Sequence, residues 1–181
     1  MFTPTNTRYG APKVLLAAVG PLMTEVAGEV ADGMIVHAFT TPRYLHDVTL
    51  PAIARGLAKA GRARKDFSLA CPVFVVTGRD AREWQQSRAS VCKQIAFSGS
   101  TPAYRGVLEA HGWGALQGEL NAMSNRGEWE AMGRRTTDEI LEQFAIVAQP
   151  SEVVECAGGA ARRLSGSTRP RGGVGPSGLA R

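Results

Sequence analysis

Three short apolar runs separated by helical segments set the fold class of this 181-residue chain. The apolar runs cover residues 14–19, 33–38 and 67–77, and helical patterns cover residues 22–31 and 42–60 between them. Continuous apolar runs are typical of the strands of parallel sheets, which are buried on both faces. Because consecutive strand–helix–strand units need right-handed crossovers, we expect an α/β chain with three adjacent parallel strands in sequence order.

The segments between and after these runs carry local signals of their own. Pro21 suits the first turn of a helix, where its missing N–H breaks no hydrogen bond. Leu22, Val26 and Val30 then recur at helical spacing. Pro72 lies in the middle of the third apolar run and predicts a bulge or an unpaired edge there. After the third run the pattern is helical, and it predicts no further strand.

Two architectures fit this order of elements. A (β/α) barrel places both connecting helices on one outer face of the sheet, whereas a doubly wound sheet places them on opposite faces. The turn after the first apolar run reads Ala-Ala-Val-Gly-Pro and lacks the G-x-G-x-x-G pattern of dinucleotide-binding folds. The faces on which the two helices lie therefore separate the two alternatives.

The basic charge of the chain is concentrated at its end. The formal net charge is +5, and residues 157–181 contain five arginines and no acid, so residues 1–156 are balanced. This tail has too few apolar side chains for their burial to offset the conformational entropy that the tail would lose on folding. We expect an N-terminal loop at 1–12, a folded body at 13–156, and a disordered tail at 157–181 without regular hydrogen bonding. Arginines without interleaved aromatic residues do not predict nucleic-acid binding.

Cysteine, histidine and hydropathy patterns exclude further classes. Cys71, Cys92 and Cys156 are odd in number and far apart, which argues against a disulfide framework and fits a reducing, cytoplasmic compartment. The histidines are scattered, so no metal site is expected. The longest run without a charged or strongly polar residue, 14–23, is half of the roughly 20 residues that a membrane helix needs. No signal peptide is visible at the N-terminus.

Several short motifs follow one another in a recognisable order. Residues 17–21 read Ala-Ala-Val-Gly-Pro, and residues 27–33 read Ala-Gly-Glu-Val-Ala-Asp-Gly. Residues 138–141 read Asp-Glu-Ile-Leu, and residues 150–155 read Pro-Ser-Glu-Val-Val-Glu. With these motifs the chain resembles, over roughly residues 10–156, the luciferase-like monooxygenase superfamily. It is most similar to the branch that uses the deazaflavin coenzyme F-420.

The resemblance implies a partial (β/α)8 TIM-barrel-like fold. The three apolar runs correspond to about strands five to seven of the family barrel, followed by a helical C-terminal stretch and the tail. Strands one to four have no counterpart, and a complete barrel takes about 250 residues. We therefore expect only part of a barrel, and a truncated or frameshifted reading frame would account for it.

The turn after the first strand is the main candidate site. Backbone N–H groups at the start of the following helix, together with the helix dipole, form an anion site. The resemblance implies that Ala17, Ala18, Val19 and Gly20 hold the phosphate of the coenzyme. His37, at the end of the second strand, is a further candidate contact. The alternatives are a tight turn that needs glycine, and a histidine of the rim or core; no catalytic residue is predicted.

The function implied is that of a luciferase-like oxidoreductase or monooxygenase. Coenzyme F-420, or flavin mononucleotide (FMN), would serve hydride transfer or oxygenation of a small organic substrate. We expect the isolated chain to be inactive, because the N-terminal half has no counterpart here. The rival interpretation is a non-catalytic fragment or subunit that associates with a complementary half, or a homo-oligomer, because open sheet edges favour association.

Overall fold

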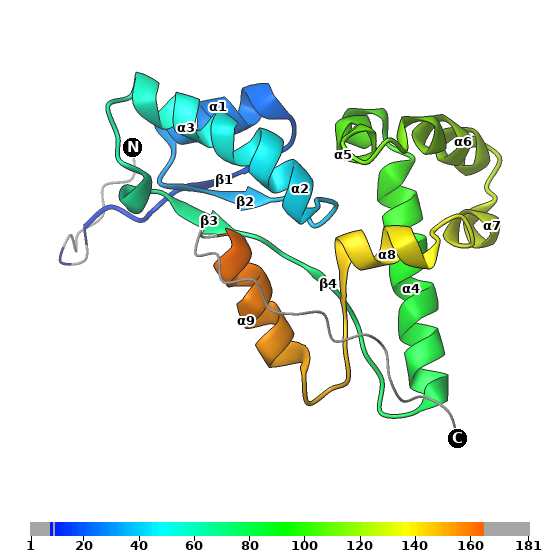
Figure 1. Cartoon of the computed structure of the whole chain (residues 1–181). Helices are drawn as coiled ribbons and strands as arrows, with labels where there is room; N and C mark the ends of the chain where they lie inside the picture. Colours follow the sequence, from blue (N-terminus) through cyan, green and yellow to red (C-terminus); the bar gives the residue numbers. More distant parts are fainter. Residues whose placement is uncertain (1–7, 9, 165–181) are drawn as a thin grey trace.

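The computed structural model describes residue 8 and residues 10–164 of the chain. Two small parallel sheets are flanked by helices, with the order β1-β2-β3 in the first and β4-β5 in the second (Figure 1). The strands are β1 (Leu15–Ala18), β2 (Gly33–Val36), β3 (Ser68–Ala70), β4 (Phe74–Val76) and β5 (Ala145–Val147). The helices are α1 (Pro21–Val30), α2 (Pro42–Tyr44), α3 (Leu50–Lys59), α4 (Ala81–Gly99), α5 (Arg105–Glu109), α6 (Gly114–Asn125), α7 (Trp129–Gly133), α8 (Asp138–Phe144) and α9 (Val153–Leu164).

The first sheet confirms the expected pairing of the three apolar runs. β1, β2 and β3 are adjacent, parallel and in sequence order. The register pairs Leu16 with Met34 and Ala18 with Val36, and these side chains share one face because strand side chains alternate. Ala18, Met34 and Val36 are buried under helices, whereas Ile35 on the opposite face is 40% exposed. The sheet is therefore covered on one face only.

The backbones of α1 and α3 approach each other closely over this covered face. A methyl group at Gly56 would lie 1.9 Å from the backbone oxygen of Glu25, and one at Gly28 would lie 2.7 Å from the α3 backbone. Arg62 stabilises the same contact, because its guanidinium donates a hydrogen bond of 3.2 Å to the carbonyl oxygen of Gly28. Both helices therefore lie on one face of the sheet, as expected for a barrel and not for a doubly wound sheet (Figure 1).

The helical pattern at 42–60 predicts a helix that Pro51 kinks or splits in two, and the structure builds this segment in three parts. Thr41 caps its start, because its Oγ1 accepts a hydrogen bond from the N–H of Tyr44 at 3.1 Å. A π-helical turn at Leu45–Thr49 joins α2 to α3 directly before Pro51, whose missing N–H interrupts the α-helical ladder. The segment nevertheless continues as a helix to Lys59.

The third apolar run differs from the single strand predicted at 67–77. It forms two strands, β3 and β4, which belong to different sheets. Pro72 lies between them and has no N–H to donate to a neighbouring strand, so the expected interruption of pairing there is confirmed. β4 pairs with β5 instead, and β5 corrects the expectation that no strand follows the third run.

A second core lies around β4 and the helical stretch. Phe39, Val76, Leu108 and Phe144 are among its buried side chains. The ring of Phe39, just after β2, stacks on that of Phe144, with centroids 4.5 Å apart. The chain leaves the first sheet after β2. Phe39, in this segment, therefore connects the first sheet to the core that lies beneath the second sheet.

The C-terminal boundary also differs from the prediction. α9 runs from Val153 to Leu164, so the expected lack of regular hydrogen bonding is wrong for residues 157–164. The rest of the predicted tail, and residues 1–7 and 9 of the predicted N-terminal loop, lie outside the described residues. None of the helices in residues 10–164 combines the length and apolarity that crossing a membrane requires.

The glycine contact between α1 and α3 gives a direct test of this packing. Gly56→Ala should lower the free energy of unfolding by about 1–3 kcal/mol, because its methyl group meets backbone that cannot move without separating the helices. Gly118→Ala in α6 is the matched control, since nothing lies within 4 Å of its added Cβ. The control should raise the stability by about 0.5–1 kcal/mol. Urea unfolding of both variants measures the difference, and a neutral Gly56→Ala would contradict the packing.

Candidate functional site at the ends of β1 and β2

A small hollow lies where β1 and β2 end. Of the predicted site residues, it is lined by Ala18, Val19, Gly20 and His37. Parallel strands bring their carboxyl ends to one edge of a sheet, which explains why these residues meet. Ala17 is not among the lining residues; its position is exposed and alternates in direction with the buried Ala18. The cavity volume is about 20 Å³, room for about one water molecule.

The turn at Gly20 leaves an open path to the start of α1. Gly20 has φ 78° and ψ 159°, a backbone conformation that glycine adopts without strain. Pro21 follows at the first helical position, and no side chain caps the N-terminus. An added Cβ at Gly20 would meet nothing within 4 Å, so the space outside the turn is open. Uncapped amides and the helix dipole together favour an anion at this point.

His37 is held as a neutral ring. Its Nδ1 accepts a hydrogen bond from the backbone N–H of Phe39 at 3.0 Å, so the proton of the neutral imidazole lies on Nε2. Burial lowers the pKa of His37 below its usual 6.5. Its ring also lies against Tyr104, with centroids 4.6 Å apart. His37 can therefore donate one hydrogen bond from Nε2 but is not a cation at neutral pH.

Two polar side chains of the hollow were not singled out from the sequence. Thr40 Oγ1 is buried and has no hydrogen-bond partner in the part of the chain that the structure describes. Tyr44 also lines the hollow, and burial raises the pKa of its hydroxyl. The sequence signal at this point, Thr-Thr-Pro, indicates only the start of a helix. A buried hydroxyl without a partner is uncommon, although most of the surface that lines this hollow is apolar.

His111 and Trp113 belong to a neighbouring structural contact. Thr41 Oγ1 and His111 Nε2 are 2.8 Å apart, and the His111 ring stacks on Trp113 at 4.7 Å. Burial, assisted by the charge of Arg43, lowers the pKa of His111. This contact ties the start of α2 to the segment between α5 and α6. Neither ring lines the hollow.

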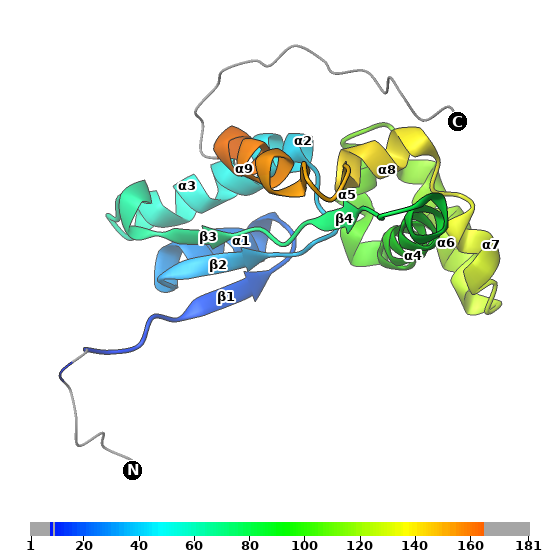
Figure 2. The same cartoon turned by 90° about the horizontal axis from the view of Figure 1, so that it is seen from below.

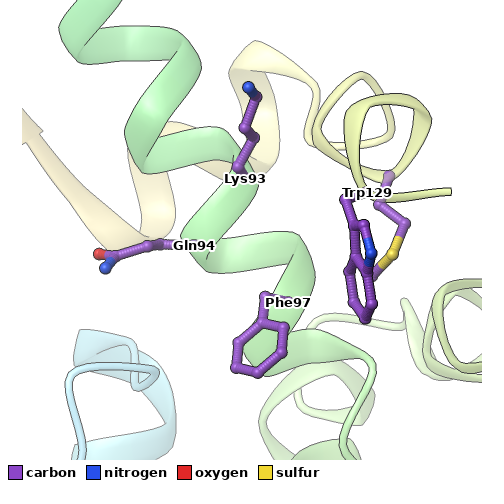
Figure 3. A pocket seen from close by; sticks show the side chains of 5 residues that line it. Lys93, Gln94, Phe97 and Trp129 are labelled. Carbon is purple, nitrogen blue, oxygen red and sulfur yellow. The ribbon is translucent and has the colours of Figure 1, made fainter. Parts of the chain in front are cut away.

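A larger cavity of about 360 Å³ lies on α4 and α7, away from the first sheet. Figure 3 shows Phe97 projecting from α4 beside the indole of Trp129. Lys93 at its margin pairs with Glu130, with Nζ and Oε1 2.6 Å apart. This cavity is open and apolar, and none of the residues that line it is an acid.

The described residues hold no cluster of potential metal ligands, and two of the three cysteines are buried or half-buried. No group of three histidine, cysteine, aspartate or glutamate side chains there is placed to hold a metal ion. Burial raises the pKa values of Cys71 and Cys92, which keeps both thiols protonated. The Gly20 turn therefore remains the feature best suited to bind a ligand.

The lowered pKa of His37 predicts a pH effect on stability. The unfolded chain binds the His37 proton more strongly than the folded chain, so stability should fall as the pH drops from 7.5 to 5.5. His37→Asn offers an amide oxygen to the Phe39 N–H without titrating, and it should reduce this fall. His46→Asn, at a 79% exposed side chain, should keep the full fall. Thermal midpoints at both pH values test this, and equal falls in both variants would disprove it.

Comparisons with known proteins place this geometry in a family. The profile of the family described as luciferase-like monooxygenase matches residues 1–163. An uncharacterized protein of Mycobacterium tuberculosis, Rv1360, is 53% identical over 147 residues, which cover 81% of this chain and 43% of that protein. The 5,10-methylenetetrahydromethanopterin reductase of Archaeoglobus fulgidus is 29% identical over 151 residues, which cover 81% of this chain and 44% of that protein.

A solved structure supports the fold assignment. The coenzyme F-420-dependent tetrahydromethanopterin reductase of Methanopyrus kandleri superposes with a TM-score of 0.66 at 24% identity, covering 83% of this chain and 42% of that one. The chain thus has an α/β fold similar to part of that reductase, and it spans less than half the length of these relatives. The resemblance seen in the motifs is confirmed: the chain belongs to the luciferase-like monooxygenase family.

Proposed function

We propose that this chain provides the coenzyme-phosphate side of an oxidoreductase site that uses coenzyme F-420. The observation that carries the proposal is the Gly20 turn, which presents the uncapped start of α1 to open space. Two solved structures of similar fold name coenzyme F-420 in their descriptions, which favours the deazaflavin over FMN: the Methanopyrus kandleri reductase and an F420-dependent secondary alcohol dehydrogenase, which superposes with a TM-score of 0.52 at 14% identity. When bound, the deazaflavin supplies hydride transfer to or from a small organic substrate, and the protein positions it.

The turn suits a phosphate group. The amides after Pro21 point out of the first turn of α1, and no side chain of the described residues competes for them. Hydrogen bonds to a charged group contribute about 1.5–3 kcal/mol each, and the helix dipole adds about 0.3–1 kcal/mol. Association costs about 4 kcal/mol or more. The turn alone therefore supports binding near the millimolar range at best.

The coenzyme ring does not fit inside the hollow itself. The hollow beside the turn holds about one water molecule, far less than a tricyclic ring needs. No step of the redox reaction is therefore assigned to a residue of this chain. His37 Nε2–H is one of the polar groups of the residues that line the hollow, and it can donate a hydrogen bond to a bound coenzyme.

A non-catalytic subunit is the second candidate function. It is favoured by the same small hollow, because the hollow is too small to enclose a coenzyme ring. The two candidates differ in whether the Gly20 turn binds the coenzyme phosphate.

An amide titration followed by NMR tests the proposal on the intact chain. Adding coenzyme F-420 should shift the amide signals of Gly20, Leu22 and Met23 progressively, with saturation near the millimolar range. FMN and inorganic phosphate should shift the same amides, because the phosphate is the recognised group. We expect no turnover from the chain alone.

Two glycine variants separate binding from backbone strain. Gly20→Ala should weaken the shifts several-fold, because a methyl group then stands over the turn. Gly61→Ala is the matched control. Gly61 has a positive φ of 64°, close to the 78° of Gly20, and a Cβ added there would also meet nothing within 4 Å. Equal weakening in both variants, or shifts confined to the α4–α7 cavity, would refute the phosphate role. Micromolar binding would show that the site is complete.

A further inference from the structure

Residues 104–113 contribute one side of the small hollow at the ends of β1 and β2. Val107 of α5 is one of the residues that line the hollow. The ring of Tyr104 lies against that of His37, with centroids 4.6 Å apart. Both views of the molecule show α5 beside α2, where the chain continues from the hollow (Figure 1, Figure 2). We call residues 104–113 the hollow wall.

Two contacts join the hollow wall to the start of α2. A Cβ added at Gly106 would lie 3.6 Å from Cε2 of Tyr44, so the tyrosine ring lies against the α5 backbone. Further along, Thr41 Oγ1 and His111 Nε2 are 2.8 Å apart. The first contact is apolar packing, and the second is a hydrogen bond to a titratable ring. Only the second can change when the pH falls below neutral.

The direction of this hydrogen bond follows from the other contact of Thr41. Its Oγ1 already accepts a hydrogen bond from the N–H of Tyr44 at 3.1 Å. Thr41 is 1% exposed, and the described residues give its hydroxyl hydrogen no acceptor other than His111. The hydroxyl therefore donates to Nε2, and the neutral ring carries its proton on Nδ1. A proton on Nε2 would set two donors against each other and leave the buried hydroxyl hydrogen without an acceptor.

The surroundings of His111 decide what its protonation breaks. Burial, and then the charge of Arg43 on α2, lower the pKa of His111 below 6.5. On the same side of the chain as His111, Glu109 of α5 pairs with Arg105 at 2.6 Å. The indole of Trp113, which stacks on the His111 ring, attracts a cation. Protonation therefore leaves the ring on Trp113 and breaks the hydrogen bond across to α2.

We propose that the hydrogen bond between Thr41 and His111 is a pH-sensitive switch that holds the hollow wall against α2 at neutral pH. When Nε2 takes a proton from the solvent, the Thr41 hydroxyl loses its acceptor and the start of α2 separates from the hollow wall. Thr40 and Tyr44 both line the hollow. Their movement with α2 widens the space beside the Gly20 turn. This inference goes beyond the proposed coenzyme role and does not depend on it.

A pH titration of the intact chain by NMR tests the switch without any coenzyme. The amide signals of Tyr44 and Val107 should shift between pH 7.5 and 5.5 with the same midpoint as the His111 ring. Hydrogen-exchange protection of the Tyr44 N–H, corrected for the intrinsic effect of pH, should fall about threefold or more over this range, because its acceptor is released. Midpoints that differ by more than about 0.5 pH unit, or constant protection of Tyr44, would overturn the proposal.

Three histidine variants assign the effect. His111→Gln offers an amide oxygen that accepts from the Thr41 hydroxyl at every pH, so the Tyr44 N–H should stay protected at pH 5.5. His46→Gln is the matched control, because the His46 side chain is 79% exposed, and it should keep the full loss of protection. His37→Asn should keep this loss too, because the titrating contact lies at His111.

The variants also contain the contrary outcomes. Equal losses of protection in His111→Gln and His46→Gln, or a loss abolished by His37→Asn, would overturn the proposal. The amide spectrum shows whether each variant is folded. If His111→Gln does not fold, the comparison of midpoints in the unmodified chain decides. Because no coenzyme enters the assay, its failure is distinct from failure of the coenzyme proposal.

Discussion

The backbone contact between α1 and α3 determines most of what the first half of the molecule can do. Gly28 and Gly56 bring the two helices closer than any side chain would permit, and this pair then covers one face of β1–β3. α1 begins three residues after the end of β1, so the contact that holds α1 on the sheet also fixes where its first turn lies. The Gly20 turn is therefore held between β1 and a helix whose position depends on α3.

Phe39 is one of the links between this half and the rest. Phe39 leaves β2 and enters the second core, where it stacks on Phe144 and lies 5.9 Å from Tyr104. Tyr104 in turn contacts His37 at the hollow. The chemistry available at the strand ends thus depends on side chains from α8 and from the 3₁₀ turn before α5, which are distant in sequence.

Sequence reasoning recovered the parts of the fold that rest on repeated local signals. The parallel order of the strands and the position of α1 and α3 follow from apolar runs and helical spacing, and Gly20 and His37 follow from their places at strand ends. β5 was not predicted, because Ala145–Val147 is too short to show the two-residue alternation of a strand and its pairing with β4 is a long-range contact. Thr40 and Tyr44 were not predicted as residues of the hollow, because their burial depends on tertiary packing.

The interruption at Pro72 has a consequence for how the molecule loses its structure. It divides one apolar run between two sheets, and each sheet has its own buried cluster. Cooperative unfolding requires that most contacts fail together, and contacts within each cluster outnumber the few links such as Phe39 between them. The two clusters are therefore expected to act as separate folding units, each with its own opening free energy.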